Sequence, residues 1–267
     1  MHLIHGKFEL SDSIKKRPST LEVFHRHGPC SKLSQDEVVA TPSLSDILAH
    51  DQSRVKSIRA RLDSIRTMDK VKDEKVNLPA HSGSSLGSGN YLVSMGLATS
   101  GSVQFTPFDS SHGSSFYFIS ITSIAVSGQQ LPIGGAVFKT AGAIIDSGTV
   151  ITRLPPAAYS ALSAAFKQGM KKYPAAPAFS ILDTCYNLSN YTSISVPTVS
   201  FTFDGEVMID LSPSGIMIAV SSTVACLAFA GNGDAANIGI FGNTQQLAFE
   251  VVYDVVGGKL GFAAAGC

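Results

Sequence analysis

The sequence predicts an all-β fold preceded by a charged helical segment, and three observations support this fold class. Residues 1–80 contain 14 lysines and arginines and 11 acidic residues, whereas the remaining 187 residues contain only 6 and 9. The later part is rich in Ser, Thr, Gly, Val, Ile and Phe, which favour strands joined by turns. Short apolar runs recur there at regular intervals, as in a β-sandwich or barrel. The change in composition places a boundary near residues 75–81.

The overall composition argues against several classes of partner. Acidic and basic residues balance at 20 each, so no nucleic acid or anionic membrane partner is expected. No apolar run approaches the roughly 20 residues of a membrane span. The first ten residues lack the apolar core of a secretory signal, so the sequence predicts no signal peptide.

The four cysteines are not at metal-ligand spacing, so we expect no zinc site and no cofactor. Cys185 and Cys226 lie in apolar, strand-like contexts and are able to form a disulfide. Two glycosylation sequons, at Asn187 and Asn190, follow in one polar loop. Cysteines and sequons together indicate an oxidising secretory compartment, in conflict with the missing signal. The other two cysteines, whose pairing the sequence leaves open, are Cys30 and Cys267.

The first predicted element is an amphipathic helix over residues 43–68. Ser43 to Asp46 forms a capping box, in which the acidic side chain returns to the amide of the cap. Arginines and lysines lie between the apolar positions, so the basic face either covers an acidic surface elsewhere or is simply solvated. The apolar positions at helical spacing are Leu44, Ile47, Leu48, Val55, Ile58, Leu62, Ile65 and Met68.

A Gly- and Ser-rich linker is predicted at residues 81–89, followed by a strand at 91–97 and a loop at 101–113. A strand at 116–126 turns at Ser127-Gly128. A second helix begins after Leu154, because proline suits the first turn, and Pro174 prevents its continuation. Its apolar stripe, read as core, is Tyr159, Leu162, Phe166 and Met170.

Seven short strands complete the β-rich part. Asn232-Gly233 and Gly257-Gly258 are predicted to be hairpin turns. The predicted strands are 199–203, 207–211, 215–220, 225–230, 238–241, 248–254 and 260–262.

One carboxylate stands between two apolar runs. Asp146 follows the run 143–145, and Ser147, Gly148 and Thr149 separate it from further apolar residues. Because a buried charge is costly without partners, this pattern fits an acid held rigidly at the end of a strand. The same residues also fit an ordinary Asx-type turn. A second apolar run, 238–241, is predicted to lie beside this loop, with Gly242 allowing close backbone approach.

These pieces resemble a known family. The motifs A-I-I-D-S-G-T, L-P-P-A-A-Y, L-D-T-C-Y, A-C-L-A-F-A, I-G-I-F-G-N-T-Q-Q and G-F-A-A-A-G-C follow the order of the C-terminal lobe of pepsin-like aspartic proteases. The plant branch that includes nepenthesin and the chloroplast-nucleoid protease is the most similar. Residues 1–80 resemble its propeptide, 81–100 a linker with a remnant first strand of the N-terminal lobe, and 101–267 the C-terminal lobe.

The resemblance implies a closed or partly closed antiparallel β lobe with short helices, and an aspartic-type endopeptidase made as a zymogen. In that family two aspartates share a proton and activate a water that attacks a peptide bond, without a metal. It implies that Asp146 is one of them, that Ser147 and Gly148 support the loop, and that Thr149 binds the outer carboxylate oxygen. It also implies a Cys185–Cys226 disulfide. The loop-crossing element would be Ile240, Phe241 and Gly242.

The sequence departs from the family pattern at the second aspartate. Asp183-Thr184 is followed by cysteine and Asp109-Ser110 by serine, so Asp146 begins the only D-[TS]-G motif. Thr99 runs directly into residues near the lobe boundary, so most of an N-terminal lobe is absent from the pattern. Activity is therefore expected to be impaired unless a homodimer pairs two copies of Asp146. The alternatives are a non-catalytic peptide-binding or regulatory lobe, or an unstable truncated product. By resemblance the location is secretory: extracellular, vacuolar or plastid.

Overall fold

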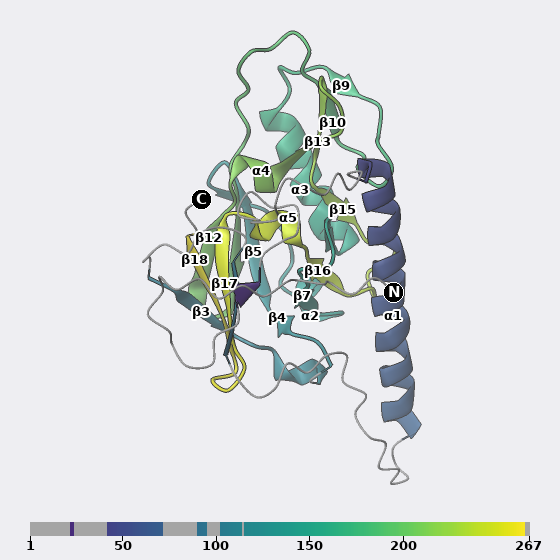
Figure 1. Ribbon diagram of the computed structural model, residues 1–267, viewed down its shortest axis with the longest axis vertical. Coiled ribbons are helices and arrows are strands. Elements are labelled where there is room, and N and C mark those ends of the chain that lie inside the picture. The colour runs from purple at the N-terminus through teal and green to yellow at the C-terminus, as the bar shows by residue number, and fades with distance from the viewer. Residues whose placement is uncertain (1–21, 24–41, 72–89, 95–101, 114, 265–267) are drawn as a thin grey trace, which may run out of the picture.

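The computed structural model describes residues 22–23, 42–71, 90–94, 102–113 and 115–264. These residues form a lobe of four sheets with short helices, and one long helix lies along its side (Figure 1). The predicted all-β class is confirmed for the lobe. The expected barrel-like closure is not observed, because each sheet is open and has four or five strands. The predicted linker at residues 81–89 lies outside the described residues.

Helix α1 spans Leu44–Val71, close to the predicted range. At its start the N–H of Asp46 donates to Ser43 Oγ at 3.2 Å. The carboxylate of Asp46 accepts from the Ser43 hydroxyl rather than from the cap amide that the capping box predicts. The stripe that α1 buries against the lobe consists of Leu48, Val55, Ile58 and Leu62. No helix among the described residues is long and apolar enough to cross a membrane.

The sheet that carries the site combines parallel and antiparallel pairs. β16 lies between β7 and β8, parallel to β7 and antiparallel to β8, and β15 pairs in parallel with β8. In order its strands are β15 (Phe229–Gly231), β8 (Thr152–Leu154), β16 (Gly239–Phe241), β7 (Ala143–Ile145) and β4 (Phe118–Ile119). Asn232-Gly233 is therefore not a hairpin turn, since β8 separates β15 from β16. The Asn232 amide instead closes a wider loop by donating to the carbonyls of Asn237 and Ile238.

Two further sheets enclose the aromatic core. Gly257-Gly258 joins an antiparallel pair, β17 and β18, as predicted. The first sheet runs β1 (Glu22–Val23), β2 (Asn90–Ser94), β17 (Phe249–Asp254), β18 (Lys259–Ala264) and β3 (Gln104–Pro107). The second runs β12 (Val207–Asp210), β11 (Val199–Phe203), β5 (Ile121–Val126) and β6 (Gln129–Gln130). At the predicted turn between β5 and β6, Ser127 and Gly128 both adopt positive φ.

The last sheet lies around the disulfide between Cys185 and Cys226, which face each other on paired strands. Two predicted strands are corrected here. The segment 215–220 begins as a helical turn because Ser212 caps it, and 225–230 is divided at Ala228 between two sheets. The strands are β13 (Met217–Ala219), β14 (Val224–Leu227), β10 (Cys185–Asn187) and β9 (Ala175–Ala176).

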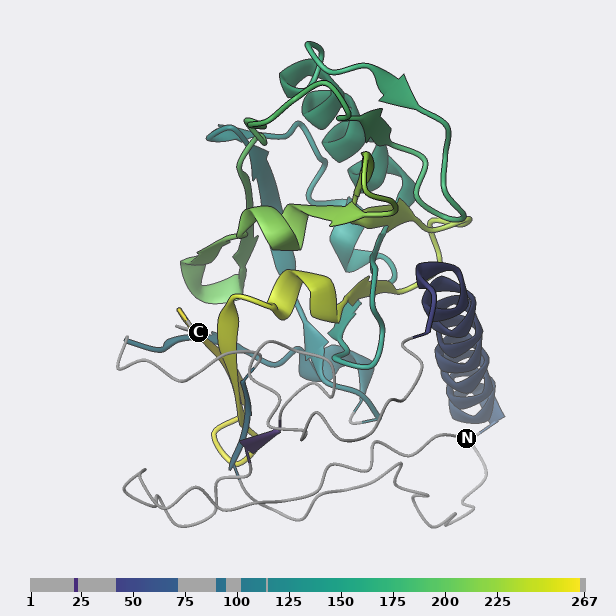
Figure 2. The same cartoon turned by 45° about the horizontal axis from the view of Figure 1, so that its top comes forward.

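The short helices fill the space between sheets. Figure 2 shows α4 and α5 lying one above the other, and α3 begins at Pro156 and ends before Pro174, as predicted. The largest fully buried side chains are Phe166, Phe201, Phe203, Phe229 and Phe241, in one cluster. The helices are α2 (Ala136–Lys139), α3 (Pro156–Gly169), α4 (Pro213–Ile216) and α5 (Asn243–Gln246), with 3₁₀ turns at η1 (Ser110–His112) and η2 (Asp204–Glu206).

Candidate active site

Asp146 is the first residue after the buried strand β7, and neighbouring strands fix its backbone. Its N–H donates to the carbonyl of Phe241, the last residue of β16, at 3.0 Å. Its own carbonyl accepts from the N–H of Thr149 at 3.2 Å, which closes a tight turn. The side chain is 15% exposed, so the carboxylate lies in a shallow position at the surface of the lobe.

Three groups bind the carboxylate of Asp146. The Thr149 hydroxyl donates to Oδ2 at 2.6 Å, and the Gly148 N–H lies 3.4 Å from Oδ1. Arg54, from helix α1, binds both oxygens, with Nε and Nη2 each at 2.7 Å. Burial alone would raise the pKa of Asp146, but the hydrogen bonds and charge of Arg54 outweigh it, and the pKa falls below its ordinary value. Asp146 is thus an ionised carboxylate capped by a guanidinium.

Arg54 lies flat over Gly148. A Cβ atom at position 148 would come within 2.3–2.5 Å of the guanidinium, so glycine leaves the space that the bidentate geometry needs. The two parallel hydrogen bonds make this a strong and directional pair. In this structure, Gly148 of the D-S-G motif therefore leaves the space that the Arg54 guanidinium occupies.

A second ion pair of opposite orientation joins α1 to the lobe one helical turn earlier. Asp51, whose side chain is fully buried, accepts from the Val150 N–H at 2.5 Å and from Arg153 Nη2 at 2.7 Å. Burial raises the pKa of Asp51, against the opposing effect of the Arg153 charge. Helix α1 thus forms two ion pairs with the lobe, Asp51 with Arg153 and Arg54 with Asp146.

Ser147 connects the aspartate loop to α5. Its hydroxyl donates to Gln246 Oε1 at 2.8 Å, and Gln246 Nε2 donates back to the carbonyl of Phe241 at 3.1 Å. Burial raises the pKa of Tyr253, which hydrogen-bonds with Ser147. In this structure the hydroxyl of Ser147, which the resemblance assigns to supporting the loop, is bound to a buried glutamine.

Gly242 lies where the chain crosses the aspartate loop. A Cβ atom there would be 2.9 Å from the carbonyl oxygens of both Thr149 and Val150. Its N–H donates to Thr152 Oγ1 at 2.8 Å. Ile240 and Phe241, the other residues of the predicted crossing element, are buried in β16. The close approach requires a residue without a side chain.

The other predicted site residues lie away from Asp146. Cys185 and Cys226 form the disulfide beneath the start of α1, in a cluster that includes Leu48 and Ile151. Asn187, the last residue of β10, and Asn190, in the loop that follows, are both exposed. Cys30 and Cys267 lie outside the described residues.

The sequence reasoning missed Asp51, Arg54 and Gln246. A signal for Asp51 was present, because it falls three residues after Leu48 and four before Val55, on the apolar stripe of α1. An acid at such a position requires a buried partner. Nothing local marks Arg54 or Gln246, whose partners are 92 and 99 residues away in the sequence.

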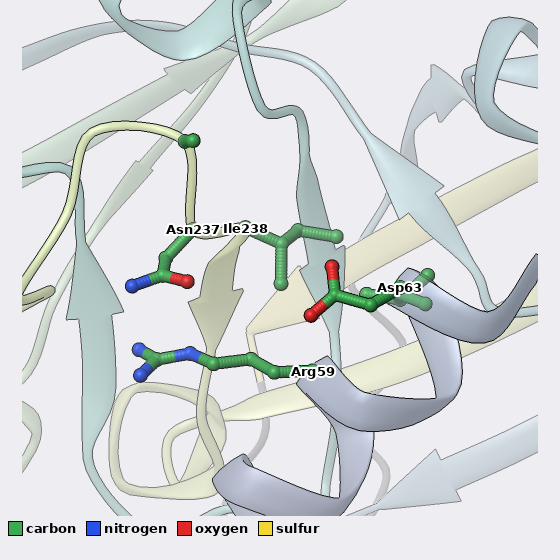
Figure 3. A pocket seen from close by; sticks show the side chains of 6 residues that line it. Arg59, Asp63, Asn237 and Ile238 are labelled. Carbon is green, nitrogen blue, oxygen red and sulfur yellow. The ribbon is translucent and has the colours of Figure 1, made fainter. Parts of the chain in front are cut away.

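A further pocket lies on the seam between α1 and the loop before β16 (Figure 3). In this view Arg59 and Asp63 of α1 face Asn237 and Ile238, and Asp146 is not among the lining residues. Arg59 also donates to Asn232 Oδ1 at 2.6 Å. Within the described part of the chain, no group of His, Cys, Asp and Glu is arranged to hold a metal ion.

Replacing Arg54 with alanine should raise the pKa of Asp146, because the hydrogen bonds and charge that oppose its burial are lost. With its pKa below the usual value, Asp146 stabilises the native chain above about pH 4, and this stabilisation disappears as the pH falls through the lowered pKa. Carboxyl NMR titration measures both effects. Lys56→Ala, an exposed charge on the same helix, is the control, and an unchanged Asp146 pKa in Arg54→Ala would contradict the prediction.

The lobe is similar in sequence to known proteins. Residues 116–264 match the xylanase inhibitor C-terminal domain family. Over 167 residues, or 62% of the chain, the sequence is 52% identical to an aspartyl protease family protein of Arabidopsis thaliana. The matched region is 35% of the length of that relative.

Two further relatives carry similar names. Aspartyl protease AED1 of Arabidopsis thaliana is 42% identical over 71% of the chain and 40% of its own length. Aspartic proteinase nepenthesin-2 of Nepenthes gracilis is 34% identical over 66% of the chain and 42% of its own length. The chain therefore spans between a third and about two fifths of the length of these curated relatives.

Proposed function

Because this chain belongs to the pepsin-like aspartic protease family, in the plant branch with a xylanase inhibitor C-terminal domain, we propose that it supplies one half of an aspartic-type endopeptidase site. The supporting observation is the carboxylate of Asp146, held by Thr149 and Gly148 at the end of a buried strand. An ionised carboxylate so placed accepts a proton from water as that water attacks a peptide carbonyl. A second, protonated carboxyl donates to the carbonyl oxygen.

The second carboxyl must come from outside this aspartate loop. Asp146 begins the only D-[TS]-G motif in the sequence, so we propose that a second copy of the chain supplies it. A two-fold axis would place the same surface on both copies, as in any isologous dimer. This arrangement requires Arg54 to leave Asp146, since the guanidinium occupies both carboxylate oxygens.

The Arg54 contact favours a second candidate function, a non-catalytic peptide-binding lobe whose binding face is covered by α1. In this reading residues 1–80 act as a propeptide-like segment, whose helix α1 covers Asp146, and residues 101–267 form the lobe. Asp146 is then ionised and paired, and a single paired carboxylate has no acid to donate. The lobe would bind peptides only when α1 is displaced.

We further propose an oxidising, secretory location. The disulfide between Cys185 and Cys226 supports it, since such bonds persist in oxidising compartments. Exposure of Asn187, at the end of β10, and of Asn190, in the following loop, is compatible with glycosylation at both asparagines.

The test of the proposed activity is cleavage of an acid-denatured protein at mildly acidic pH. We expect the Arg54→Ala chain, in which no guanidinium covers Asp146, to cleave, a statyl-type inhibitor to block cleavage, and the added change Asp146→Asn to reduce it to background. Specific activity should rise with chain concentration if two copies form the site. The matched control is Asp183→Asn, which changes an aspartate outside the D-S-G loop.

Each outcome distinguishes the two candidate functions. Cleavage that requires Asp146 rejects the hypothesis of a non-catalytic peptide-binding lobe. Absence of cleavage at every concentration, including concentrations at which dimers are observed, rejects the endopeptidase and leaves the peptide-binding lobe.

A further inference from the structure

Arg153 is a buried cation whose partner does not belong to the lobe. Its side chain is 5% exposed on β8, and its Nη2 donates to Asp51 of α1 at 2.7 Å. The other terminal nitrogen, Nη1, is buried and has no hydrogen-bond partner among the described residues. A buried guanidinium requires an opposite charge nearby, and here α1 provides it.

A second donor of the lobe points to the same place. The N–H of Val150 donates to Asp51 Oδ1 at 2.5 Å, while Arg153 holds Oδ2. One carboxylate is thus bound through both oxygens, by a charged donor and a main-chain donor. Both donors are fixed in the lobe. Arg153 pairs with Ile240 of β16 and Ala230 of β15, and the carbonyl of Val150 accepts from the N–H of Thr244 at 3.2 Å.

This carboxylate position lies beside Asp146. Asp51 and Arg54 are three residues apart on α1, so their side chains lie on one face of the helix, with their Cβ atoms roughly 5–6 Å apart. Asp51 fills the Arg153 position while Arg54 covers Asp146. A ligand that places a carboxylate on Arg153 therefore extends naturally over Asp146.

We propose that Arg153 and the Val150 N–H form a subsite that selects an acidic side chain in a peptide bound across Asp146, and that Asp51 occupies this subsite from within the chain. The proposal rests on the proposed function only in that a peptide binds to this face. Its ligand is an aspartate or glutamate side chain close to the position of bond cleavage. The unused Nη1 donor supplies a further hydrogen bond to such a ligand.

The experiment uses the full chain with Asp51→Ala and Arg54→Ala, which vacate the subsite and uncover Asp146. The chain is immobilised and offered two degenerate octapeptide libraries that are identical except for a fixed central Asp or Asn. Mass spectrometry of the retained peptides gives an Asp-to-Asn enrichment ratio. We expect about tenfold or more, the effect of a charge-assisted hydrogen bond.

Substitutions at Arg153 test the assignment. Arg153→Gln should bring the ratio to about one. Arg153→Lys keeps the charge without the planar fork and should lower the ratio severalfold, so the conclusion does not depend on one variant folding. Circular dichroism and an intact Cys185–Cys226 bond report folding. Adding Asp146→Asn should not lower the ratio, because Asp146 is not the acidic side chain's partner.

A ratio near one before Arg153 is changed, or retention of neither library, overturns the proposal. So does an enrichment ratio that is not lowered in folded Arg153→Gln or Arg153→Lys chains. Failure of the proposed endopeptidase is recognised separately, as missing Asp146-dependent cleavage in a chain that still prefers acidic peptides.

Discussion

Replacing Asp51 with alanine is expected to detach helix α1 from the lobe, at a cost of about 3–5 kcal/mol in docking free energy. The substitution removes the carboxylate that pairs with Arg153 and leaves this buried guanidinium without an acidic partner among the described residues. It also leaves the Val150 N–H without its acceptor at 2.5 Å. Undocking of α1 returns both groups to water, so the substitution lowers the free energy of helix docking and not the stability of the lobe.

Hydrogen exchange measures this effect directly. Amides in the docked part of α1, around Val55 and Ile58, should exchange a hundredfold or more faster in Asp51→Ala, as a cost of this size implies. Amides of the lobe core, such as those of β11, should be unaffected. Lys56→Ala is the control, since it removes an exposed charge from the same helix away from the seam with the lobe.

A conservative variant isolates the charge. Asp51→Asn keeps an oxygen that can accept from Val150 but leaves the positive charge of Arg153 uncompensated, so an intermediate increase in exchange is expected. Protection of α1 that is the same in wild type, Asp51→Asn and Asp51→Ala would show that the apolar stripe alone holds the helix.

The elements that depend on local sequence were predictable. The helical spacing of Leu48, Val55 and Ile58 determines which face of α1 is buried. Pro156 begins α3, and Gly257-Gly258 turns between two antiparallel strands. In each case the conformational preference lies within a few residues, where propensity and periodicity act.

The predictions that failed depend on distant pairing. Asn232-Gly233 has the composition of a hairpin turn, but β8, from much earlier in the sequence, lies between the strands that flank it. The two crossed ion pairs of the site join residues 92 and 102 positions apart. The motif therefore marked Asp146 as a candidate, whereas its ion pair with Arg54 could be found only from the structure.

The disulfide between Cys185 and Cys226 supports the same docking surface from below. Its sulfurs pack in a cluster with Leu48 of α1 and Ile151 of the lobe, next to the Val150 N–H that binds Asp51. The strands that carry the two cysteines are short, and they are paired directly at these residues. The covalent bond therefore holds in place the part of the lobe on which the start of α1 rests.

Replacing Cys185 and Cys226 together with alanine should lower the free energy of unfolding of the lobe by about 4 kcal/mol, the loop-closure cost released by a 41-residue separation. Urea unfolding measures the change, and wild type under a strong reductant should move toward the variant. Because Leu48 loses a packing partner, amides near the start of α1 should also exchange faster in the variant than in wild type. An unchanged urea midpoint would mean that β10 and β14 are held by their hydrogen bonds and core packing alone. Hydrogen exchange that increases only in the lobe would show that the disulfide does not stabilise the docking of α1, the helix that covers Asp146.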